Sequence, residues 1–529
     1  MEPTLAQMIG PEIQALVQGL RKDITSSVLA TTSGLNYYYL EEIARNIYPV
    51  FYPVLASIPR AVPMQRGVKV GGTGINYKGI VAVDSGGYPG ITEGNRNSYL
   101  SITERDFACA YKWLGKDSGV TFQAEQTAIG LDDPQGIAQL SCLNALLNDQ
   151  ERMLLWGNSG ANGVGNPMGN GFALGQTNTP SVVLASGGAI TSARYAKFAC
   201  IELTGWGIQL ATATGVTPKL HRTTANGVAE DVYGGTAQIS ALSAESAAPT
   251  NSGAGNQAFT ATVVPKPGAL GWAWYMSIAT TGAETAATCY FVGITSVPKI
   301  TVLANPVATN QAADGTQTAK AAVDLATDYS YSALDYDGIM SWVAGAQGGT
   351  QKPYLKNLLG ATLTPNGDGT IQEIEDLIYY LWSNFKISVD HLTCSSDMIG
   401  PITAGILNGG TTGSQRIVFE SNGLGTVIGG SLTVEYRSKF SVGGAAKTLT
   451  VKVHPWLPGG IILGWTVNNP YPAAGGTIPS VLRVVTLEDH FAIRYPITTL
   501  QYSMGVYCFE TLQNYIPFAH GYICGASPS

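Results

Sequence analysis

Side chains that could carry out acid–base or metal chemistry are few in this sequence and poorly spaced. The 5 histidines never stand at the HxxxH or HExxH spacing that places two imidazoles on one helix face, so no histidine-based metal site is predicted. Asp390 and His391 stand close to Ser395 and Ser396, a combination that a hydrolase could use. No GxSxG pattern surrounds either serine, and we interpret this stretch as a turn after a strand.

Glycine-rich loops that could bind ions or phosphate also lack the required residues. A calcium loop counted from Asn366 in PNGDGTIQEIED needs glycine at its sixth position, where Ile371 stands. The loop GNPMGNGFALG lacks the Lys and the Ser or Thr of a phosphate-binding loop. The 7 cysteines are far apart and include no CxxC pair. The sequence therefore predicts no catalytic residue, no cofactor and no metal site.

Low charge is the most unusual feature of the composition. Of 529 residues, 12% are Asp, Glu, Lys or Arg, against about 25% in an average protein, and there are 64 glycines and 26 tyrosines. This composition is typical of an all-β surface protein or of a subunit whose faces are covered by neighbours. The net charge of -7 argues against a basic nucleic-acid groove and against binding to anionic membranes. The sequence predicts no signal peptide and no membrane span, and its cysteines fit a reducing cytosol.

The first 62 residues are predicted to form an arm. Residues 11–30 place apolar side chains on one helical stripe, namely Ile13, Leu16, Val17, Leu20, Ile24 and Val28. Repeated prolines then favour an extended segment up to residue 63. An isolated helix of this length is marginal in water, so we expect Leu16 and Leu20 to lie in a subunit interface.

Residues 63–124 are predicted to form a long two-stranded hairpin with its tip near 84–97. A lone hairpin is only marginally stable in water, so its faces need a partner. We expect the charges near the tip to set the register of a contact with a neighbouring subunit. These charges are Glu93, Arg96, Glu104, Arg105 and Asp106. The alternative is a solvated edge that charge protects against aggregation.

A long helix is predicted from Pro134 to Trp156, with an aspartate of the preceding LDD as its cap. A run of five polar residues, 148–152, lies inside it, although the chain is poor in charge. We expect this polar girdle, including Glu151 and Arg152, to meet neighbouring subunits through hydrogen bonds and ion pairs. The alternative is exposure of the last helical turns to solvent.

The rest of the chain divides into a β-rich part and a mixed part. Short β-branched and aromatic runs separated by Gly, Pro, Ser and Thr clusters predict a β-sandwich at 180–305. A polar linker follows at 306–327. Thr370 and Glu373 are expected to form a capping box at the start of a helix over 371–385.

In this order, the elements resemble the major capsid proteins of tailed bacteriophages, which have the Hong Kong 97-type capsid fold. The local matches are the helix end at Glu151–Gly157 followed by Pro167 and Gly169, DYDGIMSWV at 335–343, the helix at 371–385, VKVHPWLPGGIILG at 451–464 and MGVYCFETLQNYIPFAHGYICG at 504–525. The resemblance implies an α+β fold with an inserted Ig-like sandwich that is all-β. The implied boundaries are 1–62 for an N-terminal arm, 63–124 for an extended loop, 125–179 for a peripheral domain with its spine helix at 134–156, 180–305 for the insert, 306–327 for the linker, 328–480 for an axial domain and 481–529 for a return to the peripheral domain.

The same resemblance implies a structural protein without enzymatic activity that self-assembles as hexamers and pentamers of an icosahedral shell. The shell would enclose double-stranded DNA without sequence-specific contacts. The arm follows the start almost at once, so we expect a separately encoded scaffolding protein, together with a portal. The resemblance also allows a decoration protein and implies no membrane partner. The chain would assemble in the host cytoplasm and reside in the virion.

A rival interpretation starts from the β-rich part of the chain. The aromatic run GWAWY, from Gly271 to Tyr275, could bind host glycan if the chain were a β-sandwich protein of the virion surface or tail. That interpretation leaves the arm, the hairpin and the long helix unexplained.

Overall fold

The computed structural model shows a mixed α+β fold. It describes residues 51–528 except for 66–67, 70, 81–88, 98–103, 129–132, 161–170, 191–195, 214–220, 224–228, 232–237, 248–256, 278–284, 287–288, 305–327, 350, 367–369, 409–434, 439, 441–446, 472–479 and 498. The predicted arm helix, with Leu16 and Leu20, and the predicted linker lie outside the described residues. None of the described helices is long and apolar enough to cross a membrane. All 7 cysteines are buried thiols.

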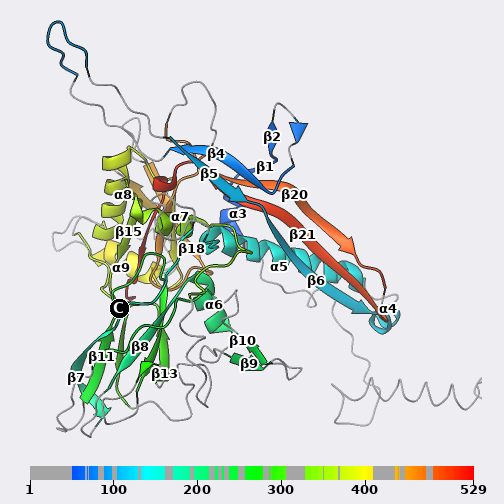
Figure 1. Cartoon of the computed structure of the whole chain (residues 1–529), viewed down its shortest axis with the longest axis horizontal. Coiled ribbons are helices and arrows are strands. Elements are labelled where there is room, and N and C mark those ends of the chain that lie inside the picture. The colour runs from blue at the N-terminus through cyan, green and yellow to red at the C-terminus, as the bar shows by residue number, and fades with distance from the viewer. Residues whose placement is uncertain are drawn as a thin grey trace, which may run out of the picture. The chain divides into compact units, whose positions relative to one another are not determined.

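The longest helix, α5, lies along a four-stranded sheet (Figure 1). It runs from Pro134 to Trp156, as predicted, and the Asp133 carboxylate accepts a hydrogen bond from Gly136 N at 3.1 Å. The helix ends before Gly157, where an added Cβ would lie 2.3 Å from the Tyr336 carbonyl oxygen. The strands of the sheet are, in spatial order, β1 (Arg60–Ala61), β20 (Leu482–Arg494), β21 (Gln501–Asn514) and β6 (Lys112–Thr121). A short helix, α4 (Phe122–Ala128), connects β6 to the region before α5.

A separate hairpin consists of β4 (Gly74–Ile80) and β5 (Glu104–Ala110). Two short strands, β2 (Met64–Gln65) and β3 (Val68–Lys69), precede it and pair with each other. The hairpin predicted over 63–124 is therefore too long, because β6 leaves it and pairs with β21 in the four-stranded sheet. Two consecutive strands give the same alternating pattern whether or not they share a sheet, so the pattern did not reveal this exchange of partners.

A six-stranded sheet and three helices form the largest core. The strands are, in spatial order, β15 (Tyr354–Asn357), β22 (Gly521–Cys524), β19 (Ile462–Trp465), β16 (His391–Ser395), β18 (Lys447–His454) and β17 (Glu435–Ser438). The helical segments are α7 (Ile339–Gly345), α8 (Gln372–Phe385) and α9 (Ile399–Asn408), with short 3-10 turns η4 (Ala346–Gly348) and η5 (Pro517–Ala519). The segment 481–529 contributes strands to two sheets. Its strands β20 and β21 belong to the four-stranded sheet, whereas β22 belongs to the six-stranded one, so the segment does not return to the four-stranded sheet over its whole length.

The helix predicted over 371–385 is α8, but its start differs from the prediction. Ile371 is the N-cap residue, and no side chain caps the helix. The Glu373 carboxylate instead accepts a hydrogen bond from Thr364 N at 3.0 Å, so the expected capping box between Thr370 and Glu373 is wrong. The apolar stripe is right, because Ile374, Leu377 and the other expected side chains are buried.

Two three-stranded sheets lie within the region predicted as an inserted sandwich. One has the order β14 (Lys299–Val302), β11 (Gln257–Thr262), β7 (Ser181–Ile190), and the other β13 (Tyr290–Thr295), β12 (Gly271–Met276), β8 (Phe198–Leu203). A single apolar cluster contains side chains of both sheets, among them Phe198, Phe259, Trp272 and Trp274. The remaining elements of this region are α6 (Gly205–Ala213), β9 (His221–Thr223) and β10 (Ala229–Asp231).

Candidate assembly surfaces

The base of the arm is attached to α5 through the carboxylate of Glu151. A short helix, α3 (Pro53–Ser57), has its first free backbone N–H groups at Val54 and Leu55. Both donate to Glu151, at 2.8 Å to Oε1 and 2.7 Å to Oε2. The carboxylate therefore satisfies donors that a helix start leaves without partners, and it lies at the positive end of the helix dipole.

A histidine from the six-stranded sheet completes the same cluster. His454 Nε2 lies 2.7 Å from Glu151 Oε1. The other ring nitrogen, Nδ1, accepts a hydrogen bond from Trp456 N, so a neutral ring carries its proton on Nε2 and donates it to Glu151. Glu151 and His454 are both 0% exposed. We call α3, Glu151 and His454 the arm clamp, because it holds the arm base, α5 and β18 together.

The rest of the polar girdle divides into internal and partly exposed residues. Asn148 accepts a hydrogen bond from Phe51 N at 3.0 Å, and Gln150 bonds both Cys508 and the ring of His490. Asn148 and Gln150 are fully buried, as Glu151 is. The expectation that the girdle meets neighbouring subunits is therefore wrong for Glu151 and its two buried companions. Their partners belong to the same chain but are far away in sequence, which a sequence pattern does not reveal.

Arg152 keeps part of its surface open. Its guanidinium donates to Asp149 at 3.0 Å and lies 3.9 Å from the centre of the Trp456 ring. Lys116 of β6 also pairs with Asp149, at 2.6 Å. The Arg152 side chain is 16% exposed, so contact with a neighbouring subunit stays a prediction for this residue.

A second buried carboxylate fixes the end of the arm segment to the four-stranded sheet. Arg60 of β1 donates to Glu510 at 2.6 Å, and Tyr336 OH donates to the other carboxylate oxygen of Glu510 at 3.1 Å. Glu510 is 0% exposed, and burial raises its pKa. Arg60 also lies 3.5 Å from Asp489, which is largely exposed. The arm segment therefore reaches the sheet in one fixed position, where β1 pairs with Val484 and Val485.

The hairpin is attached at its base. Tyr77 OH donates to Asn514 O at 2.9 Å and accepts from Asn514 N at 3.1 Å. Phe107 is 4% exposed and packs edge-on against Trp342 of α7, with ring centroids 5.5 Å apart. Ile80 N donates to Tyr515 O at 2.9 Å. Beyond this base the described tip residues, 89–97, are all exposed.

The five predicted hairpin charges do not form one cluster. Glu93 and Arg96 lie in the exposed tip segment. Glu104, Arg105 and Asp106 lie at the start of β5, close to the anchored base, where Arg105 is half-buried and Asp106 exposed. Their contact with a neighbouring subunit stays a prediction.

An aromatic surface that was not predicted lies on the four-stranded sheet, on the face opposite α5. Val506 and Cys508 of β21 pack against α5, so alternation places Tyr507 and Phe509 on the other face. Trp113 of β6 stacks on Phe509 with ring centroids 4.3 Å apart, and it is 62% exposed. This aromatic face comprises Trp113, Phe491, Tyr495, Tyr507 and Phe509. The alternation in MGVYCFE is the signal that could have revealed it.

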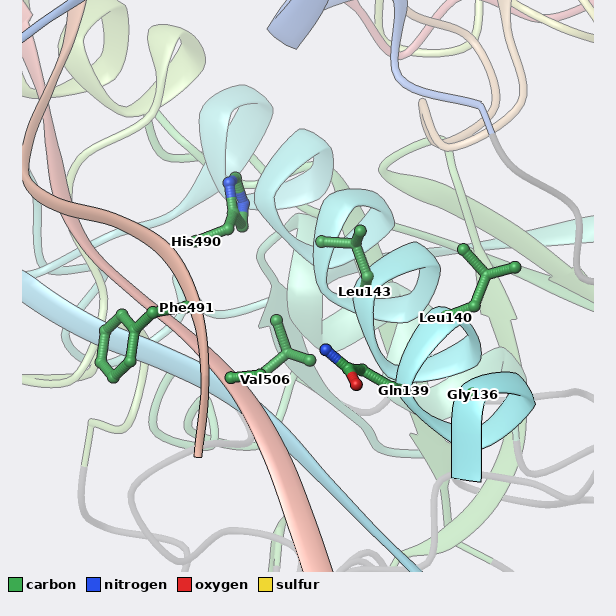
Figure 2. Close-up of a pocket in the computed structure, with 8 residues that line it drawn as sticks. Gly136, Gln139, Leu140, Leu143, His490, Phe491 and Val506 are labelled. Atoms are coloured by element: carbon green, nitrogen blue, oxygen red, sulfur yellow. The ribbon is translucent and has the colours of Figure 1, made fainter. Parts of the chain in front are cut away.

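A groove on the α5 side separates the first half of the helix from β20 and β21 (Figure 2). It encloses about 280 Å³ and is lined by Gly136, Gln139, Leu140, Leu143, His490, Phe491, Ala492 and Val506. Leu143 and Val506 point into it, whereas the Phe491 ring points away, as its place on the aromatic face requires (Figure 2). Leu140 is 49% exposed. This apolar rim is a second surface that a neighbour could cover.

The residues considered for other functions have structural roles. All of GWAWY, which is most of β12, is buried, and Trp272 and Trp274 are 0% exposed, so this run does not present a glycan-binding surface. His391 stacks on Trp465 at 4.4 Å, and Ser395 donates to Asp397. Among the described residues, no group of His, Cys, Asp and Glu could hold a metal ion.

Buried carboxylates also lie beside the loop that follows α5. Asp337 accepts hydrogen bonds from Ser159 N at 2.7 Å and Ser159 Oγ at 2.9 Å. Burial raises the pKa of Asp337 to about 7, with the neighbouring Asp335 carboxylate adding to the effect. Burial raises the pKa of Asp335 to about 6, although Gln238 donates to it. These two groups titrate in a pH range where surface carboxylates stay charged.

Comparison with known proteins finds similarity at the level of structure. No family model and no curated protein matches the sequence. A capsid structure of the cyanophage A-1(L) is similar with 9% identity and a TM-score of 0.39, covering 95% of this chain and 99% of that one. The capsid structure of the cyanophage P-SCSP1u is similar with 10% identity and a TM-score of 0.33, covering 94% and 97%. Both are capsid structures, the class of protein that the sequence resembles.

An encapsulin complex from Synechococcus elongatus is a more partial match. It has 12% identity and a TM-score of 0.19, and the match covers 33% of this chain and 54% of that one. This chain therefore spans about half the length of that encapsulin. At such TM-scores the similarities do not assign a function, and the contacts described above have to supply the reasons.

The arm clamp predicts that Glu151→Gln strongly destabilises the chain. The amide keeps the shape of the side chain, but its NH2 group must face a donor, either a backbone N–H of α3 or His454. Leaving buried donors unpaired should lower the free energy of unfolding by about 2 to 4 kcal/mol. Chemical denaturation measures this loss, and hydrogen exchange at Val54 and Leu55 should accelerate.

Asp149→Asn is the matched control for the clamp. It removes one charge from the same helix turn, but this carboxylate is 24% exposed and pairs at the surface, so its loss should be below about 1 kcal/mol. Equal losses for both variants, with unchanged exchange at Val54 and Leu55, would show that the clamp does not hold the arm base.

The raised pKa of Asp337 predicts that stability falls as pH rises. In the unfolded chain this carboxyl titrates near its ordinary value of about 3.9, whereas in the folded chain its pKa is about 7. The folded form thus binds the proton more tightly, and the resulting stabilisation is complete below about pH 4 and is lost by about pH 7. Relative to the wild type, the melting temperature of Asp337→Asn should therefore rise between pH 5 and pH 8. The control Asp376→Asn removes the carboxylate of a surface ion pair with Lys356, and its melting temperature should differ from that of the wild type by the same amount at both pH values.

Proposed function

We propose that the chain is the major capsid protein of a tailed double-stranded DNA bacteriophage. It self-assembles as hexamers and pentamers of an icosahedral shell that encloses the genome. The proposal joins the resemblance of the sequence to this class of protein with the architecture of the chain. It assigns a structural role without enzymatic activity.

One observation carries the proposal: buried contacts hold the described base of the arm and the base of the hairpin, while the described tip residues of the hairpin, 89–97, are exposed. The arm enters the fold at Phe51, where the arm clamp and the Arg60–Glu510 pair fix its position. The hairpin is fixed at Tyr77 and Phe107, while its described tip is exposed. A hairpin or an arm helix is only marginally stable alone in water, so both extensions gain stability from another subunit.

The exposed apolar surfaces support the same function. The aromatic face presents Trp113, which is 62% exposed. The groove beside α5 presents Leu140, which is 49% exposed. Trp and Tyr are the residues that most often dominate subunit contacts. A shell covers such surfaces many times over, and each contact can be weak because symmetry repeats it.

The proposed partners follow from the same role. The chain binds itself, and a separately encoded scaffolding protein and a portal take part in assembly, which occurs in the host cytoplasm. The insert offers an outer surface that a decoration protein could use. The shell wall confines DNA without sequence-specific contacts, consistent with a net charge of -7. The mature chain resides in the virion and has no membrane partner.

We assign the parts of the chain to the domains of such a protein. The four-stranded sheet with α5 forms the peripheral domain, the six-stranded sheet the axial domain, and the hairpin β4–β5 the extended loop. The two three-stranded sheets form the inserted sandwich. We also assign Leu16 and Leu20 of the arm to a subunit interface. Glycan binding through GWAWY is not favoured, because that run is core.

The proposed function predicts that charge reversal on the hairpin blocks assembly without unfolding the subunit. Arg96→Glu or Arg105→Glu would place like charges together at each repeated contact, at a cost of a few kcal/mol. Electron microscopy and sedimentation should find shells or capsomers for the wild type and soluble subunits for the variants. Lys299→Glu, an equal charge change on an exposed position of β14, is the control and should assemble. Shells of normal yield from both hairpin variants would contradict the assigned role of these charges.

The domain assignment predicts that the insert is dispensable for shell closure. Val183 and Val302 lie on strands that only β11 separates. The two ends that the deletion leaves are therefore about 10 Å apart, a distance that a few Gly and Ser residues can bridge. Replacing residues 183–302 by such a linker should preserve capsomers, because most side chains of the core between the two sheets come from the sheets themselves. Loss of all assembly, with the remaining fold intact by circular dichroism, would overturn this assignment.

A further inference from the structure

Strand β7 forms an edge of the sheet β14–β11–β7 (Figure 1). Its sequence, SVVLASGGAI, contains no charged residue and no proline. β11 pairs with one side of it from Ser181 to Ser186, and no strand pairs with the other side within the described part of the chain. Natural proteins usually protect such an edge with charge, proline or a covering segment. An unprotected edge of this kind suits pairing with another strand.

The core beneath β7 is also incomplete at this edge. Val182 packs against the core shared by the two sheets, and alternation places Leu184 on the same face. Leu184 is nevertheless 37% exposed, whereas Phe259, its cross-strand partner on β11, is 0% exposed. On the outer face Val183 is 62% exposed. A further strand beside β7 would cover Leu184 and extend the core.

We propose that this further strand is β7 of a second copy of the chain, paired antiparallel across a two-fold axis perpendicular to the sheet. The joined sheet has the order β14–β11–β7–β7–β11–β14. This symmetry keeps Val182 and Leu184 on the core face in both copies and Val183 on the outer face in both. The uncharged edge offers no charge pattern that would select a partner of different sequence, whereas an identical strand matches it in side-chain size and polarity.

The length of the paired segment limits the strength of the contact. Gly187 has a φ of 90°, a left-handed conformation that ends the regular strand after Ser186. Six residues per strand bury less than the ~1,200 Å² of a stable interface between proteins. The pairing is therefore too small to hold two free chains together. It acts between copies that other contacts already hold close, which links it to an assembled form of the chain but to no particular shell geometry.

Single cysteine substitutions at each position from Ser181 to Ser186 test the pairing in the full chain. All 7 native cysteines are buried, so they contribute little background under mild oxidation. Paired Cα atoms in an antiparallel sheet are about 4.5–5.5 Å apart, within the range for a disulfide, whereas a residue one step from the axis is over 7 Å from its own copy. Disulfide-linked dimers should therefore peak at one position and fall on both sides of it. Equal crosslinking at all positions, or none in folded and assembled chains, would overturn the proposal.

A charge on the edge provides the second measurement. Once the cysteine scan has located the axis, a lysine at the exposed outer-face position nearest to it, Ser181 or Val183 when the peak lies at 182, places like charges close together across the axis and leaves the core intact. In the best-crosslinking cysteine background it should lower the crosslinked fraction about tenfold. Val264→Lys, at a position that is 72% exposed and outside the strands, is the matched control and should not change it. An unchanged fraction for the lysine beside the located axis would overturn the pairing.

The outcomes for pairing and for shell formation are separable. Closed shells without a crosslinking peak would contradict the β7 pairing and leave the shell function standing. A peak in assemblies that are not shells would support the pairing and contradict the shell function.

Discussion

The buried carboxylate of Glu151 is the interaction on which the arrangement of this chain depends. A charge without contact to water is strongly unfavourable unless donors surround it. Here the donors come from α3, which precedes Glu151 in sequence, and from His454, which follows it by 303 positions. The arm base, the long helix and the six-stranded sheet must therefore assemble together.

The placement of the few charged residues is related to the unusual composition of the chain. With only 12% charged residues, the chain uses several of them internally, at Glu151, Glu510, Asp335 and Asp337. Its surfaces carry Trp113, Leu140 and Val183 instead. A monomer with such surfaces would tend to associate, as the proposed shell function requires. The low surface charge and the buried carboxylates are thus related: buried polar groups stabilise the fold of the subunit, and exposed apolar groups are left for contacts between copies.

Sequence reasoning predicted what local patterns determine. The bounds of α5 followed from its proline, its cap and its final glycine, and the buried stripe of α8 followed from helical spacing. It failed where partners are distant in sequence. Strand alternation could not tell that β6 joins β21, and a run of polar residues could not tell that Glu151 bonds α3 within the same chain. The interface role of the hairpin charges stays a prediction. The aromatic face was missed, because the alternation in MGVYCFE separates the two faces of the strand but does not by itself say which face is exposed.

Under the proposed function, strong and weak contacts are divided between the inside and the outside of the subunit. Contacts inside the subunit, such as the arm clamp and the Arg60–Glu510 pair, are buried and charge-assisted, so removing one partner is costly. The surfaces proposed to contact other copies are small: a hairpin tip, a stacked tryptophan, a groove of about 280 Å³ and an edge of six residues. Weak contacts can dissociate and form again, so in the proposed shell a misplaced subunit could leave before the shell closes. Because symmetry would repeat each contact in every copy, their sum would make a closed shell stable while each single step of assembly stays reversible.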